Sequence, residues 1–275
     1  MTRVLVSADD FGLSESVNEG IERAYRDGIL QAASLMVAGA AAADAVRRAR
    51  TMPGLRVGLH LVVIEGPAVL PPAEIADLVD ARGVFPSDQL RLGLRYAFHS
   101  RVRRQLAAEV RAQFTAFAAT GLVLDHANAH KHMHLHPTVG GLMIGIGREF
   151  GLCRVRIPAE PPYVMAACGE PVGLGARALY RWTRLLRRQA RRAGMQTNDH
   201  VFGIAWSGRM TAERVLRLVP HLPGGTSEIY FHPASRRDPM IDGLMPQYLH
   251  EAELAALLDP RVRQALTPSS AHVSR

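Results

Sequence analysis

The sequence is poor in lysine, cysteine and aromatic residues, and it has no long apolar run. Lys131 is the only lysine among 33 basic residues, and aromatic residues make up 6% of the chain. Neither Cys153 nor Cys168 belongs to a CxxC pair, which argues against a disulfide scaffold and a cysteine-based zinc site. No stretch approaches the roughly 18 consecutive apolar residues of a transmembrane helix, and the N-terminus resembles a strand rather than a signal peptide. We therefore expect a cytoplasmic protein in a reducing compartment.

The chain is basic and has the composition of a globular protein. Its 275 residues are 48% hydrophobic and 21% charged, and 33 basic against 25 acidic residues give a net charge of +8. The basic excess suggests an anionic partner, namely a nucleic acid, a membrane surface or an acidic ligand. No recognised nucleic-acid-binding module accompanies it, so we expect no nucleic-acid partner.

Short apolar runs alternate with longer helical patterns along the chain. The strand-like runs are 4–6, 33–37, 57–61, 122–124, 155–157, 201–204 and 229–231, and the helical patterns lie near 14–28, 41–51, 101–119, 138–151, 174–193, 211–219 and 247–258. This alternation predicts a parallel sheet. We expect a single domain over residues 1–275, an irregular TIM-like (β/α) barrel of about seven parallel strands. A doubly wound open sheet is the alternative.

Two segments interrupt the alternation, residues 65–100 and 159–176. The first contains four prolines between residues 67 and 86, and the second is also rich in proline and glycine. Long loops that follow a strand are often functional. We expect both segments to be loop insertions near the active site, and the first to act as a lid.

Adjacent carboxylates, Asp9 and Asp10, follow the first predicted strand. Two such groups repel one another when they are held together, and a bound metal removes that cost. One carboxylate can then coordinate the metal while the other acts as a base. The alternative is a turn or a helix N-cap, because aspartate before glycine is common there.

The segment from His126 to Pro137 contains five histidines and Asn128 in alternating positions. In an extended chain alternate residues share a face, so Leu122 and Leu124 would lie on the same face as the histidines. The pattern places apolar residues low on a strand and imidazoles at its carboxyl end, where barrel active sites gather. Imidazole is a ligand of zinc and other transition metals. The alternative is a surface cluster that binds metals adventitiously.

Two more histidines lie at or beyond predicted strands. His60 lies within an apolar strand, where a core histidine is the alternative, and His232 lies at a strand end before a proline, where a solvent-facing loop is the alternative. In a (β/α) barrel the carboxyl ends of the strands converge on one mouth, so these histidines and the aspartates can meet there. One aspartate and two histidines leave coordination positions free for water and substrate.

These motifs together resemble the YdjC-like carbohydrate deacetylases. The resemblance covers about residues 2–258, and the length and the loop at residues 65–67 are most similar to the hopanoid biosynthesis-associated branch. The matching segments are Ala8-Asp9-Asp10-Phe11-Gly12-Leu13-Ser14, Gly58-Leu59-His60-Leu61, His126 through Pro137, and His232-Pro233.

The resemblance implies a metal-dependent N-deacetylase on a β/α barrel. It implies one divalent ion, Mg²⁺ or Zn²⁺, that is held by Asp10, His60 and His130. Asp9 is then the catalytic base and His232 the acid. Asn128 stands where the family usually has an aspartate, which puts the charge beside the ligands in doubt. The remaining candidates lie around the ligands or contact substrate: His126, Asn128, His132, His134 and Arg156.

The implied substrate is an N-acetylated sugar, and for the hopanoid branch a glycolipid with an N-acetylglucosaminyl headgroup. Residues 177–193 form a basic amphipathic helix that contains Trp182, which suits a peripheral contact at the inner face of the membrane. An outer barrel helix with a solvated arginine face is the alternative. A homodimer is compatible with the sequence. Soluble chitooligosaccharides are the alternative substrates, and a metal-dependent phosphoesterase is the alternative enzyme, because its arginines could hold phosphate.

Overall fold

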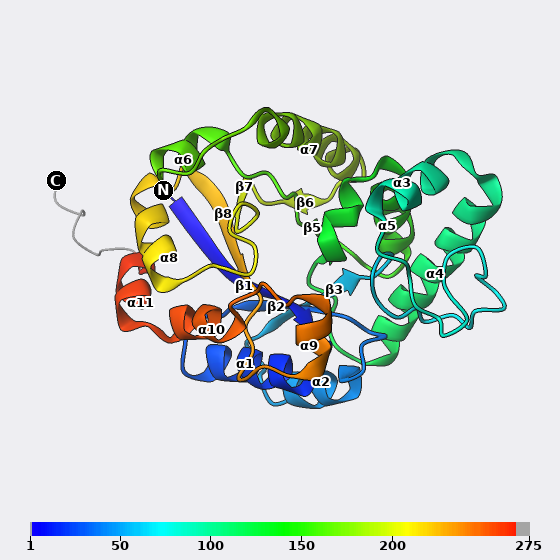
Figure 1. The fold of residues 1–275 in the computed structure, drawn as a ribbon, viewed down its shortest axis with the longest axis horizontal. Coiled ribbons are helices and arrows are strands. Elements are labelled where there is room, and N and C mark those ends of the chain that lie inside the picture. Colours follow the sequence, from blue (N-terminus) through cyan, green and yellow to red (C-terminus); the bar gives the residue numbers. More distant parts are fainter. Residues whose placement is uncertain (1, 268–275) are drawn as a thin grey trace.

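The sheet of the protein is entirely parallel and curls into a half-barrel. The computed structural model describes residues 2–267, and its strands run in the order β6-β5-β4-β3-β2-β1-β8-β7. The curl is visible in Figure 1, where helices surround the sheet. The fold therefore confirms the TIM-like barrel architecture. The strands are β1 (Thr2–Phe11), β2 (Ala32–Leu35), β3 (Arg56–Leu61), β4 (Ala127–Ala129), β5 (Arg154–Val155), β6 (Gln196–Thr197), β7 (His200–Phe202) and β8 (Gly225–Phe231).

Helices connect most of the strands and pack their apolar faces against the sheet. Ser14 begins the first of them, because its hydroxyl accepts a hydrogen bond from the Val17 amide, as expected of an N-cap. No helix among residues 2–267 is both long and apolar enough to cross a membrane. The helices are α1 (Glu15–Arg26), α2 (Ala42–Ala49), α3 (Gln89–Phe98), α4 (Ser100–Ala119), α5 (Pro137–Glu149), α6 (Pro162–Ala167), α7 (Leu174–Arg192), α8 (Ala212–Leu218), α9 (Pro239–Leu244), α10 (His250–Leu258) and α11 (Pro260–Leu266), with 3₁₀ turns η1 (His130–Leu135) and η2 (Val219–His221).

The fourth strand lies later in the sequence than its apolar signal. Residues 122–124 are not a strand, and Val123 is 85% exposed, whereas the chain joins the sheet at Ala127–Ala129. The observed strand, Ala-Asn-Ala, is short and carries no branched apolar residue, so its sequence gives little β signal. The sheet has eight strands, whereas the sequence predicted about seven. The strand that the prediction missed is β6, which has only two residues, both polar.

Both segments that we expected to be loops contain a helix. Residues 65–100 include α3, and residues 159–176 include α6 and the start of α7. The prolines do not prevent these helices, since Pro162 occupies the first helical position of α6, where its missing amide hydrogen costs nothing. The 65–88 part remains irregular, apart from a short antiparallel bridge between Pro67 and Val84.

Candidate active site

The end of β1 brings two adjacent carboxylates into one buried region. Asp9 and Asp10 are 2% and 1% exposed. In a regular strand neighbouring side chains point to opposite faces. Here the pairing of β1 with β2 shifts register between Ala8 and Phe11, and Asp10 adopts a φ of 63°. Such a backbone conformation costs an aspartate on the order of 1 kcal/mol, and strain of this kind is concentrated at functional sites.

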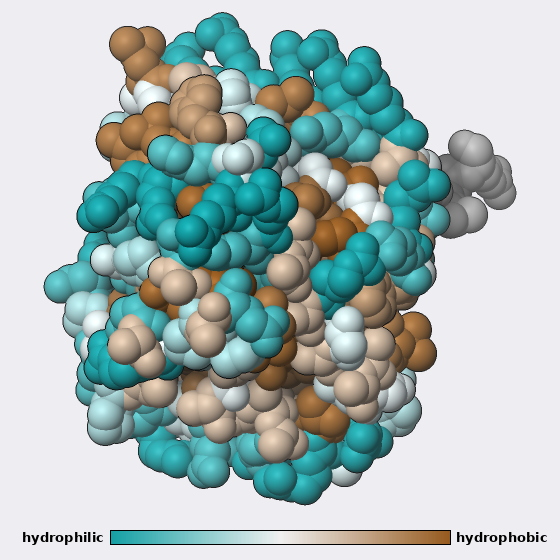
Figure 2. All heavy atoms as spheres, turned by 90° about the vertical axis from the view of Figure 1, so that its right-hand side faces the viewer, coloured by the Kyte–Doolittle hydropathy of each residue, from teal (hydrophilic) through white to brown (hydrophobic). Residues whose placement is uncertain are grey.

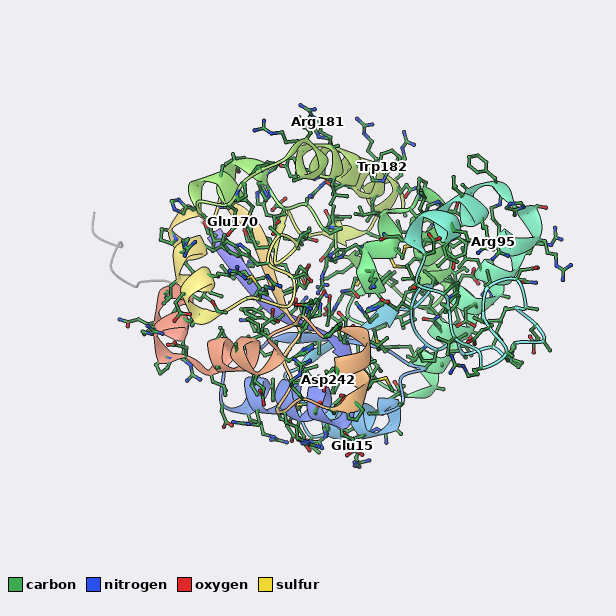
Figure 3. All side chains as sticks on the ribbon, viewed as in Figure 1. Glu15, Arg95, Glu170, Arg181, Trp182 and Asp242 are labelled. Atoms are coloured by element: carbon green, nitrogen blue, oxygen red, sulfur yellow. The ribbon has the colours of Figure 1, made fainter. Side chains whose placement is uncertain are left out.

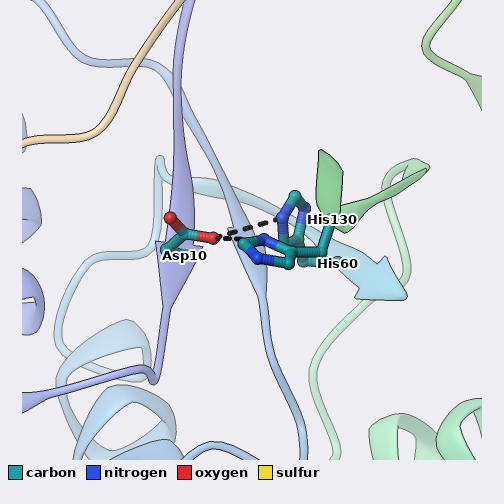
Figure 4. A group of neighbouring side chains, drawn as sticks. All are labelled: Asp10, His60 and His130. Atoms are coloured by element: carbon teal, nitrogen blue, oxygen red, sulfur yellow. Dashed lines mark hydrogen bonds and ion pairs between the residues drawn. The ribbon is translucent and has the colours of Figure 1, made fainter. Parts of the chain in front are cut away.

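Asp10 meets two histidines from neighbouring strand ends. Its Oδ1 lies 3.3 Å from Nε2 of His60 on β3 and 3.2 Å from Nδ1 of His130, which follows β4 (Figure 4). One potential ligand atom from each residue lies within 4.8 Å of the other two, and all three side chains are buried. The Oδ2 atom of Asp10 is buried without a hydrogen-bond partner. A buried carboxylate oxygen in that state is costly unless a cation or proton donor completes it.

The hydrogen bonds of Asn128 define the state of His60. The Asn128 amide nitrogen donates to Oδ1 of Asp9 at 3.1 Å and to Oγ of Ser34 at 3.0 Å, so its Oδ1 is the atom that accepts from Nδ1 of His60 at 2.8 Å. With its hydrogen on Nδ1, a neutral His60 turns the lone pair of Nε2 toward the carboxylate of Asp10. Only an added proton or a bound cation makes that contact favourable. The trio therefore fits a divalent metal.

The two carboxylates and His60 have shifted pKa values. Burial alone raises the pKa of Asp9, but the charge of Arg156 and its hydrogen bond at 2.6 Å outweigh this and hold the pKa well below its usual range. Burial also opposes ionisation of Asp10, yet His130 and His60 lower its pKa well below the usual value. Burial alone would lower the pKa of His60, but the carboxylates of Asp9 and Asp10 have the larger effect, and the pKa is raised above its usual value. Both aspartates are therefore ionised at neutral pH.

Arg156 is itself fixed in the barrel interior. The side chain is 2% exposed, and its guanidinium donates to Glu228 on β8 at 2.9 Å and to Oγ of Ser7 at 3.1 Å, besides its bond to Asp9. An arginine that spans two carboxylates in a buried site neutralises both. Arg156 therefore contacts Asp9 directly and holds it in place beside Asp10, which with His60 and His130 forms what we call the metal trio, the candidate metal ligands.

The histidine segment does not continue as an extended chain. Lys131 and His132 adopt φ values of 50° and 54°, so the chain turns after His130, and the expected alternation through to His136 is wrong. His132 forms a hydrogen bond of 3.0 Å with the Tyr230 hydroxyl. Nδ1 of His134 accepts the amide hydrogen of Ala129 at 3.1 Å, and its Nε2 donates to the carbonyl of Arg156 at 3.1 Å. His134 thereby holds the turn against β4 and β5.

His126 lies apart from the trio, deeper in the barrel. Its Nε2 accepts from the Ser34 hydroxyl at 3.1 Å, and its Nδ1 donates to Asp125 at 3.1 Å. Since Ser34 accepts from Asn128, a chain of hydrogen bonds connects His126 to His60 without any direct contact. Alternation therefore holds for His126, Asn128 and His130, which share the interior face of β4.

His232 follows β8 and is held through its backbone. Its amide donates to a carboxylate oxygen of Glu253, and its carbonyl accepts from Nδ1 of His250 at 2.7 Å. The imidazole lies edge-on to Tyr230 and Tyr248, and its Nδ1 has no hydrogen-bond partner but lies 3.9 Å from a carboxylate oxygen of Glu253. Burial lowers the pKa of His232 to about 4 and raises that of Glu253 to about 7. The ring is therefore neutral at pH 7 before any substrate or metal binds.

Sequence patterns missed several residues that complete this region. Glu253 gives no signal, because it lies on α10 far from His232 in sequence, and Ser34 occupies an apolar strand. Tyr230 could have been found, since it lies two residues before His232 and shares its face of β8.

A cavity of about 830 Å³ adjoins the carboxyl end of β1. Leu13, Glu65 and Met240 lie in its wall, together with much of the 65–95 segment, and the lining is mainly apolar. Glu65 also forms an ion pair with Lys131, the residue that follows His130. The first expected insertion therefore contacts the residue that follows His130.

Comparison with known proteins identifies relatives over nearly the whole chain. A carbohydrate deacetylase of Geobacillus stearothermophilus is 30% identical over 93% of this chain and 89% of its own length. A carbohydrate deacetylase of Thermoanaerobacter pseudethanolicus is 26% identical over 96% and 94%. These names agree with the enzyme class expected from the sequence, a hydrolase that removes an N-acetyl group from a carbohydrate.

A solved structure has the same fold. It is that of a candidate cellobiose-phosphate cleavage protein of Enterococcus faecalis V583, which superimposes with a TM-score of 0.75 at 21% identity over 96% of this chain and 94% of its own. The sequence profile of the YdjC-like proteins matches residues 3–267, which include every strand apart from the first residue of β1, as well as Asp10, His60 and His130. The chain belongs to the YdjC-like protein family.

Proposed function

We propose that the protein is a metal-dependent N-deacetylase of N-acetylated amino sugars, with one divalent ion held by Asp10, His60 and His130. The observation that carries this proposal is the His60–Asp10 contact, in which a ring nitrogen faces a carboxylate and only an added proton or a bound cation makes the contact favourable. Mg²⁺ and Zn²⁺ are both candidates, and the two imidazoles favour zinc. A bound ion supplies Lewis acidity and an activated water.

Asp9 is the proposed general base. It is buried and ionised, and its oxygens accept hydrogen bonds from Arg156 and Asn128 rather than from His60 or His130. Its low pKa makes it a weak base in isolation, so the water that it deprotonates must itself be acidified. The water adds to the acetyl carbonyl, the carbon–nitrogen bond breaks, and acetate leaves.

His232 is the proposed acid for the leaving amine. Because its pKa is about 4 in the buried resting state, it must gain a proton during turnover. The proton that Asp9 removes from water balances the proton that the amine nitrogen receives. His132, His134, Asn128, Arg156 and His126 then position these groups or contact substrate.

The proposed substrate is the N-acetylglucosaminyl headgroup of a hopanoid lipid. The mainly apolar cavity, whose wall is connected to the residue after His130 by the Glu65–Lys131 ion pair, supports this choice, because it would suit an apolar aglycone better than a second sugar. A peripheral membrane contact through residues 177–193 and a homodimer are further parts of the proposal. On α7 the apolar stripe is partly used in packing, since Leu186 and Ala190 are buried while Trp182 is half exposed.

The test is a deacetylation assay read by mass spectrometry, with and without EDTA. It compares an N-acetylglucosaminyl hopanoid, N,N′-diacetylchitobiose and a generic phosphoester. EDTA-sensitive loss of acetyl from the lipid alone supports the full proposal. Loss from chitobiose alone retains the deacetylase and rejects the lipid. Phosphoester hydrolysis without acetate release replaces the proposal with the phosphoesterase.

Two variants test the proposed roles. Asp9→Asn and His232→Ala should each lose at least about 100-fold in kcat with an accepted substrate, which is the usual contribution of a general acid or base. Metal content, measured by mass spectrometry of the purified protein, should stay near the level of the unaltered chain in both. Near-full activity in either variant contradicts the role assigned to that residue.

A further inference from the structure

Helix α3 exposes a stripe of large apolar side chains. Leu90, Leu94 and Phe98 are 75%, 53% and 79% exposed, and their spacing of four residues places them on one face. Leu92 and Tyr96, on the opposite face, are buried at 1% and 0%. The helix therefore packs through one apolar face and presents a second one to solvent.

A contiguous apolar face of this kind is unusual on a protein surface that is exposed to water. Exposed apolar residues are normally scattered, whereas a contiguous set marks a docking site. Figure 2 views the side of the molecule that carries α3 and α4, and hydrophobic atoms form a patch at its upper left edge among hydrophilic ones. The stripe is not needed for the fold, because the other face of α3 supplies its packing.

The surroundings of the stripe are basic. Residues 89–108 contain no aspartate or glutamate and five arginines, whereas Asp88 caps the helix and Asp77 and Asp80 line the cavity beside it. The arginines are Arg91, Arg95, Arg101, Arg103 and Arg104. Arg101 forms an ion pair of 2.7 Å with Asp77, and within residues 2–267 the other four form none. Leucine and phenylalanine on one face with unpaired arginines beside them are the composition of helices that lie in the interface of an anionic membrane.

We propose that the exposed face of α3 docks on an anionic lipid bilayer. Leu90, Leu94 and Phe98 would enter the acyl boundary while the arginines contact lipid phosphates. A second copy of the chain is a poorer occupant, because a symmetric contact would set the same arginines against one another in a molecule of net charge +8. This surface is separate from the amphipathic helix at residues 177–193, whose apolar residues Leu186 and Ala190 are buried against the rest of the protein.

The position of α3 gives this docking a consequence for the active site. Arg91 and Arg95 line the apolar cavity together with Met240, so a docked α3 brings the cavity to the membrane surface. Figure 3 shows Arg95 on α3 and Trp182 on α7 along the upper right of the molecule. Trp182 donates to the carbonyl of Leu135 at 2.8 Å, and Tyr96 packs edge-on against His136. Helices α3 and α7 therefore both contact the segment Leu135–His136. The further idea that a lipid substrate enters the active site from this side rests on the proposed function.

Vesicle co-sedimentation of the full metal-free chain tests the docking without any assay of activity. The vesicles contain phosphatidylcholine with or without phosphatidylglycerol. We expect binding to the anionic vesicles that weakens with salt, and a loss of at least about tenfold in partitioning for the triple variant Leu90→Ser, Leu94→Ser, Phe98→Ser. The matched control is Val123→Ser, which removes an equally exposed apolar residue before β4 and should leave binding unchanged.

Folding and function are checked separately. Circular dichroism should show a folded triple variant, and its activity on the substrate dispersed in a neutral detergent should equal that of the unaltered chain. The binding assay measures no activity, so a failed deacetylase assay leaves the docking result intact. Absence of binding by the unaltered chain, or unchanged binding by the triple variant, overturns the proposal. A dimer in light scattering that dissociates in the triple variant overturns it in favour of self-association.

Discussion

Asn128 touches the proposed base and a proposed ligand with one amide group. Its nitrogen donates to Asp9 and its oxygen accepts from His60. An aspartate at this position could accept from the histidine, but it would set a second carboxylate against Asp9. The departure from the usual family residue therefore keeps the orientation of His60 and removes a repulsion, which answers the doubt that the sequence raised.

Substitution of Asn128 should separate these two effects. Asn128→Ala leaves His60 unoriented, so metal affinity should fall about 10- to 100-fold, as measured by calorimetry. Asn128→Asp should keep metal affinity and activity, because a carboxylate oxygen can also accept from Nδ1 of His60 and the added charge only raises the low pKa of Asp9. Equal metal affinity in the alanine variant contradicts the orienting role.

His134 should make stability sensitive to acid. Burial holds its pKa well below 6.5 in the folded chain, while the unfolded chain binds a proton near pH 6.5. A group with a lowered folded pKa contributes stability at high pH, and this contribution is lost as the pH falls below 6.5. Between pH 6.5 and 5, the free energy of unfolding should therefore decline less steeply in His134→Gln, by up to about 1.4 kcal/mol per pH unit.

Urea titrations of the metal-free protein measure this slope. Glutamine can accept from the Ala129 amide and donate to the Arg156 carbonyl, so it serves as a neutral replacement. Identical slopes for the two proteins contradict a buried neutral His134.

At this scale the sequence predicted which residues meet but not how they are held. Asp10, His60 and His130 are single residues at strand ends, and barrel topology alone brings them together. The left-handed conformations of Asp10, Lys131 and His132 have little sequence signal, because aspartate and histidine adopt them more often than most residues but still only occasionally. They are imposed by the tertiary contacts around them, such as the hydrogen bonds of His134.

At the scale of elements, the sequence did not predict short helices that depend on contacts with distant parts of the chain. Helix α9 has six residues and is stabilised from outside: the Asp238 carboxylate accepts from the amides of Met240 and Ile241, and Ser16 of α1 donates to it. Longer helices such as α4 and α5 were predicted to within two residues at each end, because their apolar periodicity extends over several turns.

Loss of the Asp238 cap should loosen α9. Asp238→Ala removes the acceptor for two amides and should destabilise the protein by about 1 kcal/mol in urea titration. Asp238→Asn is the matched control, since asparagine caps as well as aspartate, and it should stay within about 0.5 kcal/mol. Because Met240 lies in the cavity wall, hydrogen exchange at residues 239–244 should rise in the alanine variant alone.

At the scale of the whole molecule, the carboxyl ends of four strands of a curled sheet supply the residues of the candidate site. β1, β3, β4 and β8 are far apart in sequence, and no local pattern orders them, but an all-parallel sheet with its helices outside leaves one mouth for all of them. The sequence predicted this convergence correctly. It did not reveal the open edge between β6 and β7, which depends on two very short strands.

Metal should stabilise the entire fold because it completes the buried Asp10 carboxylate. At 100 times its dissociation constant, a ligand that binds only the folded state adds about 2.7 kcal/mol. For a chain of this size this is a rise of about 5 to 10 °C in Tm. Differential scanning calorimetry with EDTA or with added Zn²⁺ or Mg²⁺ measures it. Asp10→Asn should abolish the rise, and a rise that persists in that variant places the ion elsewhere.

The single lysine offers a chemical handle on this architecture. Apart from the N-terminus, Lys131 carries the one primary amine of the chain, next to His130 and paired with Glu65 of the cavity wall. An amine-directed fluorophore would therefore attach at a defined place between the metal trio and the cavity. The other basic residues are arginines and do not react, so one labelled molecule could report both metal uptake and the arrival of an apolar ligand.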